Sequence, residues 1–307
     1  MKRNSVAPLI VFVYKRMEHT RQTLLAANQN ILAEETELYI FSDGPKTKGD
    51  EEKVNEVRAF IHEFKKDSRF RTVTVIESDE NKGLANSIIQ GVTEIICRHD
   101  RVIVLEDDLV TSPYFLTFMN DCLDYYAENS KVWSIGGTTF DLPSLKDYKK
   151  DVYACYRASS WGWATWKNRW ERVDWQVSDY QEFMRSPKRK RQFRLGGQDT
   201  VTELKRQQKG EIDVWAIRWC YQESKEQAVT ILPVKNLVRN IGWGGDATNC
   251  DVDRFHTNID NRKFDYTLEN VEINSRLMKE FRKYYYRPWY RRVMDYMYVT
   301  IKKVVRW

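Results

Sequence analysis

Apolar and polar positions in the first 130 residues form blocks that predict strands and helices in turn. Apolar or alternating runs of strand length cover residues 8–14, 37–41, 71–77 and 101–105. Between them, apolar residues recur at steps of three and four over 24–32, 54–64 and 84–95, as on one face of a helix. This order predicts an α/β fold in which a mostly parallel sheet is flanked by helices on both faces.

Local signals predict where two of the helices begin. Thr20 is a plausible N-cap for the first helix, and Thr111 or Ser112 for a helix that has Pro113 at its first position. The second half is less regular and contains neither an internal repeat nor a low-complexity linker. We therefore expect one catalytic domain over residues 1–275, with a ligand-binding half (1–130) and an irregular half (131–275), followed by a basic helical tail (276–307).

Polar side chains follow three of the predicted strands. They are Lys15 and Arg16, then Ser42, Asp43 and Gly44, and finally the acidic triplet Glu106, Asp107 and Asp108. Ligands of open parallel sheets bind at the carboxyl ends of the strands. The sequence therefore predicts a binding site where these three clusters meet.

The acidic triplet predicts a divalent-cation site. Three carboxylates that end a buried strand would cost several kcal/mol without a partner. Hard carboxylate oxygens suit Mg²⁺ or Mn²⁺, which could bridge them to a diphosphate. The alternative is an exposed acidic turn that caps the following helix.

Composition and charge narrow the functional class. Apolar residues make up 42% and charged residues 31% of the 307-residue chain, as in folded globular proteins. The five cysteines are too scattered for a zinc site or a disulfide framework. No apolar stretch reaches the roughly 18 residues that span a bilayer, and the short run at 9–13 lacks a signal-peptide cleavage site. We therefore expect a cytoplasmic protein.

The net charge of +6 is uneven. Residues 281–307 hold eight Lys or Arg against one acid, Asp295, so the remainder is near neutral and a nucleic-acid-binding surface is not indicated. The same tail is rich in Tyr and Trp. Basic and interfacial aromatic residues without spanning length favour a segment that lies on an anionic membrane surface, here the inner face of the cytoplasmic membrane. The alternative is a helix packed on the catalytic domain.

At the triplet the chain resembles a known group of enzymes. Val104-Leu105-Glu106-Asp107-Asp108-Leu109, preceded by Asn81-Lys82-Gly83-Leu84-Ala85, is similar to the GT-A glycosyltransferases, especially bacterial family-2-like transferases and the N-acetylglucosaminyltransferase I group. The resemblance covers roughly residues 8–250. It implies a GT-A fold and transfer of a sugar from a nucleotide-diphosphate donor, a UDP-sugar, to a hydroxyl of a glycan or lipid-linked acceptor in bacterial surface polysaccharide or glycolipid assembly.

The resemblance also implies roles for single residues on the donor side. Arg16 would lie by the phosphate or ribose, and Asp43 would accept a hydrogen bond from the base. Lys82 would flank the donor, and Asp108 would bind the metal. Glu106 and Asp107 would contact the ribose or the donor sugar.

Two later segments fit the same group. Trp161 and Trp163 lie in an aromatic loop whose rings could stack on sugars, although core packing is the alternative for each. An inverting transferase needs a carboxylate that takes the proton of the acceptor hydroxyl. The best match is Asp213, with Glu211 or Asp199 as substitutes.

The chain departs from the group in a late loop. Residues 240–250 carry Asn249 where a histidine metal ligand is expected, and Asp246 and His256 are other candidates. Two rival functions remain. A nucleotidyltransferase would need a Gly-rich loop after the first strand, and residues 11–20 contain no glycine. A membrane-surface binding protein with a structural acidic cluster is the non-enzymatic alternative.

Overall fold

The computed structural model describes residues 5–243, 258–263 and 265–286. Its helices are α1 Met17–Asn28, α2 Glu51–Asp67, α3 Leu84–His99, α4 Phe115–Tyr125, α5 Lys167–Trp170, α6 Tyr180–Arg185, α7 Pro187–Phe193, α8 Thr200–Gln208, α9 Trp215–Lys225 and α10 Ser275–Tyr284. Its strands are β1 Leu9–Val13, β2 Glu37–Ser42, β3 Thr72–Glu77, β4 Arg101–Glu106, β5 Leu109–Thr111, β6 Val132–Gly136, β7 Val152–Cys155, β8 Trp163–Trp166, β9 Val229–Pro233 and β10 Val238–Asn240.

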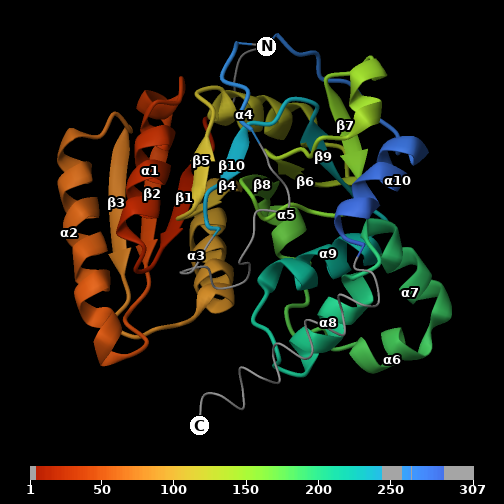
Figure 1. Ribbon diagram of the computed structural model, residues 1–307, viewed down its shortest axis with the longest axis horizontal. Helices are drawn as coiled ribbons and strands as arrows, with labels where there is room; N and C mark the ends of the chain where they lie inside the picture. The colour runs from red at the N-terminus through yellow and green to blue at the C-terminus, as the bar shows by residue number, and fades with distance from the viewer. Residues whose placement is uncertain (1–4, 244–257, 264, 287–307) are drawn as a thin grey trace.

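Within the described chain, one eight-stranded sheet in the order β3-β2-β1-β4-β8-β6-β9-β7 joins the two halves of the sequence (Figure 1). The pairs of β1 with β2 and β4, of β2 with β3, and of β6 with β9 are parallel. Strand β8 runs antiparallel to both β4 and β6, and β7 runs antiparallel to β9. The predicted α/β class, a mostly parallel sheet flanked by helices, is confirmed.

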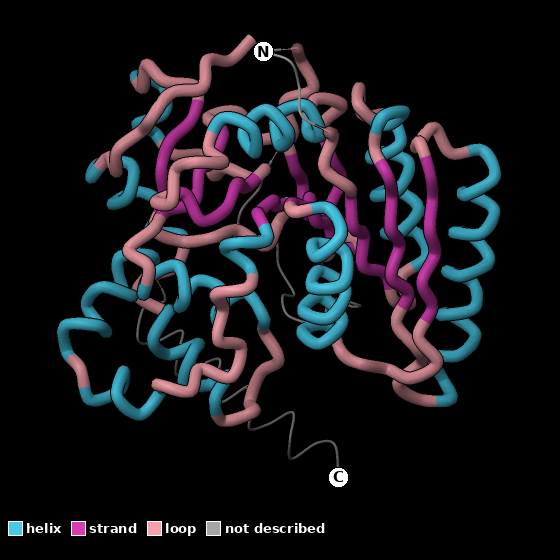
Figure 2. The backbone as a smooth tube through the Cα atoms, turned by 180° about the vertical axis from the view of Figure 1, so that it is seen from behind, coloured by secondary structure: helices cyan, strands magenta, loops and turns pink. Residues whose placement is uncertain are grey.

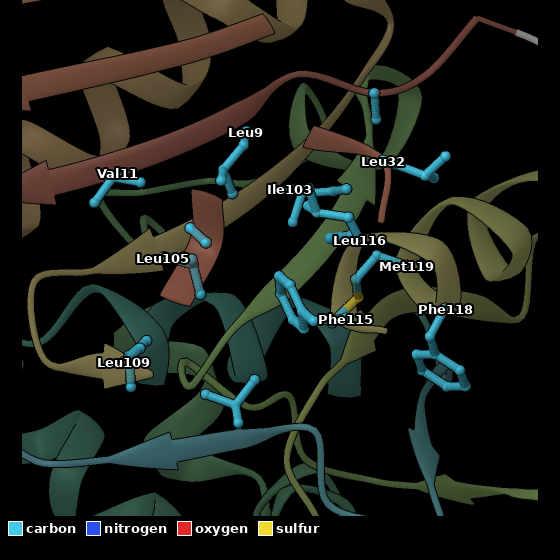
Figure 3. Close-up of a cluster of buried hydrophobic side chains, with 14 of the residues drawn as sticks. Leu9, Val11, Leu32, Ile103, Leu105, Leu109, Phe115, Leu116, Phe118 and Met119 are labelled. Atoms are coloured by element: carbon cyan, nitrogen blue, oxygen red, sulfur yellow. The ribbon is translucent and has the colours of Figure 1, made fainter. Parts of the chain in front are cut away.

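Alternating side chains of the central strands supply two separate cores. Leu9, Val11 and Val13 of β1 pack with α1, α2 and α4 on one face, whereas Ile10 and Phe12 pack with α3 and α9 on the other. Figure 3 shows part of the first core, where β1 meets the side chains of α4. Each buried aliphatic or aromatic side chain contributes about 1.5–3 kcal/mol, so both faces hold the sheet in place.

One predicted helix start is wrong by about one turn. Helix α1 begins at Met17, with Arg16 at the N-cap position and Thr20 fully buried inside the helix. Helix α4 begins at Phe115, slightly later than predicted. Ser112 still accepts hydrogen bonds just before this helix, from the Tyr114 N–H at its Oγ (3.4 Å) and from the Phe115 N–H at its carbonyl (3.1 Å).

Short helices of the second half form a lobe beyond one end of the sheet. Helices α6, α7 and α8 lie at the lower right of Figure 1, and the reverse view in Figure 2 shows the same group at the lower left. The lobe is joined to the sheet through α9, whose Trp215, Ile217 and Trp219 are buried. This arrangement places the lobe beside the end of the sheet where the loop from β3 enters α3 (Figure 1).

Part of the predicted tail packs on the sheet. Leu277, Met278 and Phe281 of α10 are buried against the side chains of Phe140 and Tyr153. These apolar side chains are therefore not available to a membrane, as the packed-helix alternative expects for this part. Residues 287–307, which carry most of the basic charge, lie outside the described residues. None of the described helices is long and apolar enough to cross a bilayer.

Candidate functional site

The acidic triplet and Arg16 lie at the carboxyl ends of adjacent parallel strands. Phe12 of β1 is in register with Glu106 of β4, so the residues that follow the two strands leave the sheet side by side. Asp107 and Asp108 then form the short connection to β5. The sequence prediction that these two polar clusters meet is therefore confirmed.

Arg16 forms the main contact with the two aspartates. Its Nε donates to Asp107 Oδ2 at 3.3 Å and its Nη2 donates to Asp108 Oδ2 at 2.8 Å, while Nη2 also contacts Asp107 Oδ1. The exposed fractions of the three side chains are only 20%, 8% and 13%. Burial lowers the pKa of Arg16, but the charges and hydrogen bonds of both aspartates raise it above its ordinary value, so Arg16 stays a cation.

The surroundings of Glu106 raise its pKa. Burial, with a further contribution from the negative charges of Asp108 and Asp107, raises the pKa of Glu106 to about 8. A side-chain hydrogen bond from Trp215 acts against this shift. Burial also raises the pKa of Asp107, and the positive charge of Arg16 acts against this shift.

The donor set of the triplet fits a divalent cation in its chemistry. Asp107 and Asp108 present hard carboxylate oxygens, which suit such a cation. In this structure the two carboxylates converge on the positive charge of the Arg16 guanidinium. Among the described residues, no group of three or more His, Cys, Asp or Glu side chains is arranged to hold a metal. The predicted further ligands, Asp246, Asn249 or His256, lie outside the described residues.

The start of the late loop covers the triplet. Strand β10 pairs with β5, so that Asn240 lies opposite Leu109, and the Ile241 N–H donates to the Asp108 carbonyl at 2.9 Å. His19, in the first turn of α1, also contacts this loop, with Nε2 3.2 Å from the Ile241 carbonyl oxygen. The sequence alone offered no reason to assign His19 to the site.

Gly242 packs directly on the ion pair. A Cβ at this position would lie 2.0 Å from Asp108 Oδ2 and 3.0 Å from Arg16 Nη1. We therefore expect Gly242→Ala to displace the Asp108 carboxylate and to lower any activity that depends on this carboxylate by about a hundredfold, since a shift of about 1 Å can cost that much. A change in melting temperature should be small. Steady-state kinetics and thermal unfolding check this, with Gly49→Ala as a control, because its added Cβ would make only an ordinary contact, 3.7 Å from Thr47 Oγ1. Unchanged kinetics in Gly242→Ala would contradict the contact.

Asp43 holds the loop that leads into α3. Its carboxylate accepts hydrogen bonds from the backbone N–H groups of Gly44, Lys82 and Gly83 at 2.9–3.1 Å and from Asn81 Nδ2 at 3.1 Å. Because four donors hydrogen-bond to this carboxylate, Asp43 fixes the position of the loop. The contact of Asp43 with a nucleotide base stays a prediction. The Lys82 side chain is exposed and borders an open polar hollow of about 500 Å³, whose lining does not include the triplet.

Asp213 lies next to the same end of the sheet. Its Oδ2 is 3.5 Å from the Ala85 N–H in the first turn of α3. Two residues later, Trp215 starts α9 and hydrogen-bonds Glu106, so this segment connects α3 with the triplet. The two substitutes have other partners: Glu211 pairs with Arg206 and Lys209, and Asp199 pairs with Arg157 through both carboxylate oxygens.

The two predicted sugar-stacking tryptophans differ in burial. Trp163 is only 1% exposed on β8, and its ring contacts the rings of Trp170, Trp215 and Trp219. Its assignment to sugar binding is therefore wrong in this structure, because β8 is an interior strand whose side chains are covered on both faces. Trp161 is half-buried, and its ring meets the ring of Trp243 in the late loop at 5.7 Å. Sequence reasoning named this loop but missed Trp243.

Comparisons with known proteins assign no family. No family model matches the chain, and no curated protein matches it in sequence. Similar solved structures include S. aureus TarS, with a TM-score of 0.43 and 9% identity over 76% of this chain and 37% of TarS. HddC from Yersinia pseudotuberculosis has a TM-score of 0.32 and 12% identity over 52% of this chain and 77% of HddC. The galactosyltransferase LgtC, solved with donor and acceptor sugar analogues, has a TM-score of 0.37 and 11% identity over 72% of each chain.

This chain thus spans little more than a third of TarS. At such low identities and scores, these similarities carry no argument about substrate or mechanism. The narrower resemblance to the N-acetylglucosaminyltransferase I group stays a prediction.

Proposed function

We propose that the protein is a glycosyltransferase that moves a sugar from a nucleotide-diphosphate donor to an acceptor hydroxyl. The single observation that supports this best is the meeting of Arg16, the acidic triplet and the Asp213–Trp215 segment at the carboxyl end of the sheet. A cation, carboxylates and a candidate base within one polar site are the groups that such a transfer needs. The motif resemblance adds the donor class.

The donor would lie along the strand ends from β2 to β4. The loop held by Asp43, which includes Lys82, would border the nucleotide, and Arg16 would meet the phosphates. UDP is the proposed nucleoside diphosphate. Mn²⁺ or Mg²⁺, held by Asp108 with Asp107, would offset the negative charge of the departing diphosphate when bound.

Asp213 is the proposed base of an inverting displacement. The acceptor hydroxyl oxygen would attack the anomeric carbon and lose its proton to the Asp213 carboxylate, while the bond from that carbon to the diphosphate oxygen breaks. Asp213 is exposed and borders α3 and Trp215, which leaves it accessible to an acceptor. Trp161 and Trp243 are candidates for stacking on the acceptor sugar.

Asp213→Asn is expected to lower the transfer rate by about a hundredfold or more, because general-base catalysis contributes 10²–10⁴-fold. Donor binding should change little, since the substitution leaves Arg16 and the triplet intact. Turnover and donor affinity, measured separately, check this. Glu211→Gln is the matched control, because its partners are surface cations; a loss in the control alone would move the base to Glu211.

The acceptor is proposed to be a glycan or lipid-linked sugar in bacterial surface polysaccharide or glycolipid assembly, at the inner face of the cytoplasmic membrane. The support is the sequence of residues 287–307, where six Lys or Arg stand among aromatic residues. Sedimentation with anionic and with neutral vesicles, with and without residues 287–307, tests this placement.

A screen of common nucleotide sugars in Mn²⁺, Mg²⁺ or EDTA tests the function itself. We expect one donor to bind and to be hydrolysed slowly without an acceptor. Binding of no donor under any of these conditions would favour the rival function, a membrane-surface binding protein with a structural acidic cluster.

A further inference from the structure

The acidic triplet already holds a positive charge of its own chain. The guanidinium of Arg16 contacts both oxygens of Asp107 and one oxygen of Asp108. All three side chains are largely buried, so little water is available to replace these contacts. A guanidinium that satisfies two converging carboxylates occupies the place that a divalent cation would take.

Arg16 and the backbone of Gly242 both lie close to Asp108 Oδ2. This oxygen accepts from Arg16 Nη2 at 2.8 Å, and a Cβ added to Gly242 would lie 2.0 Å from it. The backbone of Ile241 fixes the loop here through its bond to the Asp108 carbonyl. A divalent ion that binds this oxygen therefore competes with the Arg16 guanidinium for it.

We propose that Arg16 is an internal competitor for the divalent cation and passes from the carboxylates to the diphosphate when that cation binds. In the metal-free protein, Arg16 offsets one of the two negative charges of the aspartates. When Mn²⁺ or Mg²⁺ takes Asp108, the guanidinium is released at the mouth of the same site, where a diphosphate needs a cation. This step rests on the proposed function, because the diphosphate is the ligand that receives Arg16.

Charge balance gives the reason for such a transfer. With Arg16 in place, the two aspartates leave the cluster with an excess of negative charge, which disfavours an anionic diphosphate. A divalent cation reverses that excess and frees a guanidinium whose planar fork suits phosphate oxygens. Metal and diphosphate should therefore bind better together than apart, and each should strengthen the other by the same factor.

Mn²⁺ binding to the full-length protein, followed by the loss of the free-ion electron paramagnetic resonance signal, tests the competition. We expect Arg16→Gln to bind Mn²⁺ about tenfold or more tightly than the unchanged protein, because a competing charge about 4 Å from the ion is removed. Arg21→Gln, on the exposed face of the same helix where Arg21 pairs with Glu18, should bind Mn²⁺ like the unchanged protein. Asp108→Asn should abolish binding in either background.

UDP added to the same titrations tests the transfer to the diphosphate. It should tighten Mn²⁺ binding to the unchanged protein clearly more than to Arg16→Gln. If Arg16→Gln does not fold, as judged by circular dichroism, Arg16→Met takes its place, because it also removes the charge and keeps a long unbranched side chain.

The outcomes separate this proposal from the proposed function. Equal or weaker Mn²⁺ binding by Arg16→Gln, or no Mn²⁺ binding by either protein, overturns the competition. Equal tightening by UDP in both proteins overturns the transfer. If neither protein binds UDP or another nucleoside diphosphate while Arg16→Gln still binds Mn²⁺ more tightly, the glycosyltransferase function fails and the competition at the carboxylates stands.

Discussion

Asp108→Asn is expected to lower sugar transfer by about a thousandfold, the upper end of what one electrostatic contact at a transition state contributes. Asparagine has nearly the same shape as aspartate but no negative charge. It would lose the ion pair with Arg16 and offer a neutral amide where a cation ligand is proposed. The diphosphate would then leave without its counter-charge. Transfer kinetics at saturating donor, together with the affinity for UDP and Mn²⁺, measure the loss.

Asp100→Asn is the matched control. Asp100 lies just before the N-terminal end of β4, whereas the triplet lies at the C-terminal end. Its side chain is 87% exposed, and its backbone adopts a left-handed conformation that asparagine also tolerates. The control should keep both activity and melting temperature. Asp108→Asn should keep its fold as well, so a loss of activity with an unchanged melting temperature supports a chemical role. Full activity in Asp108→Asn would contradict the role of the triplet.

Trp163→Ala is expected to lower the free energy of unfolding by about 3–5 kcal/mol, the usual cost of removing a large aromatic side chain from a core. The ring is 1% exposed and stacks on Trp170 with a centroid separation of 5.7 Å. It also contacts Trp215, whose side chain holds Glu106, so the cavity would extend towards the site. Urea unfolding monitored by circular dichroism measures the change in stability.

Trp161→Ala separates packing from sugar recognition. Trp161 lies two residues earlier but is only half-buried, so its removal should cost less stability and weaken acceptor binding more. Trp161→Ala should therefore cause the larger increase in acceptor KM, and Trp163→Ala the larger decrease in the unfolding midpoint. A stable Trp163→Ala protein with weakened sugar binding would restore the original sugar-stacking prediction for Trp163.

The order of elements in the first half follows from the sequence alone. Residues of β1 and β4 are apolar almost throughout, as expected of strands covered on both faces, and α2 and α3 show a helical period. Polar residues at the strand ends could be assigned to one site because parallel strands end at the same edge. That inference placed Arg16 beside Asp107 and Asp108 without any knowledge of packing.

Only the tertiary structure decided which distant segments complete the site. Apolar periodicity reports which face of an element is covered, but not by what. The insertion of β8 beside β4, which buries Trp163, and the contacts of Trp215 with Glu106 and of Gly242 with Asp108 join residues more than 50 positions apart. Such contacts depend on how separate elements pack together. A local pattern therefore predicts each element, but it does not predict which elements become neighbours or how burial changes the pKa values in the site.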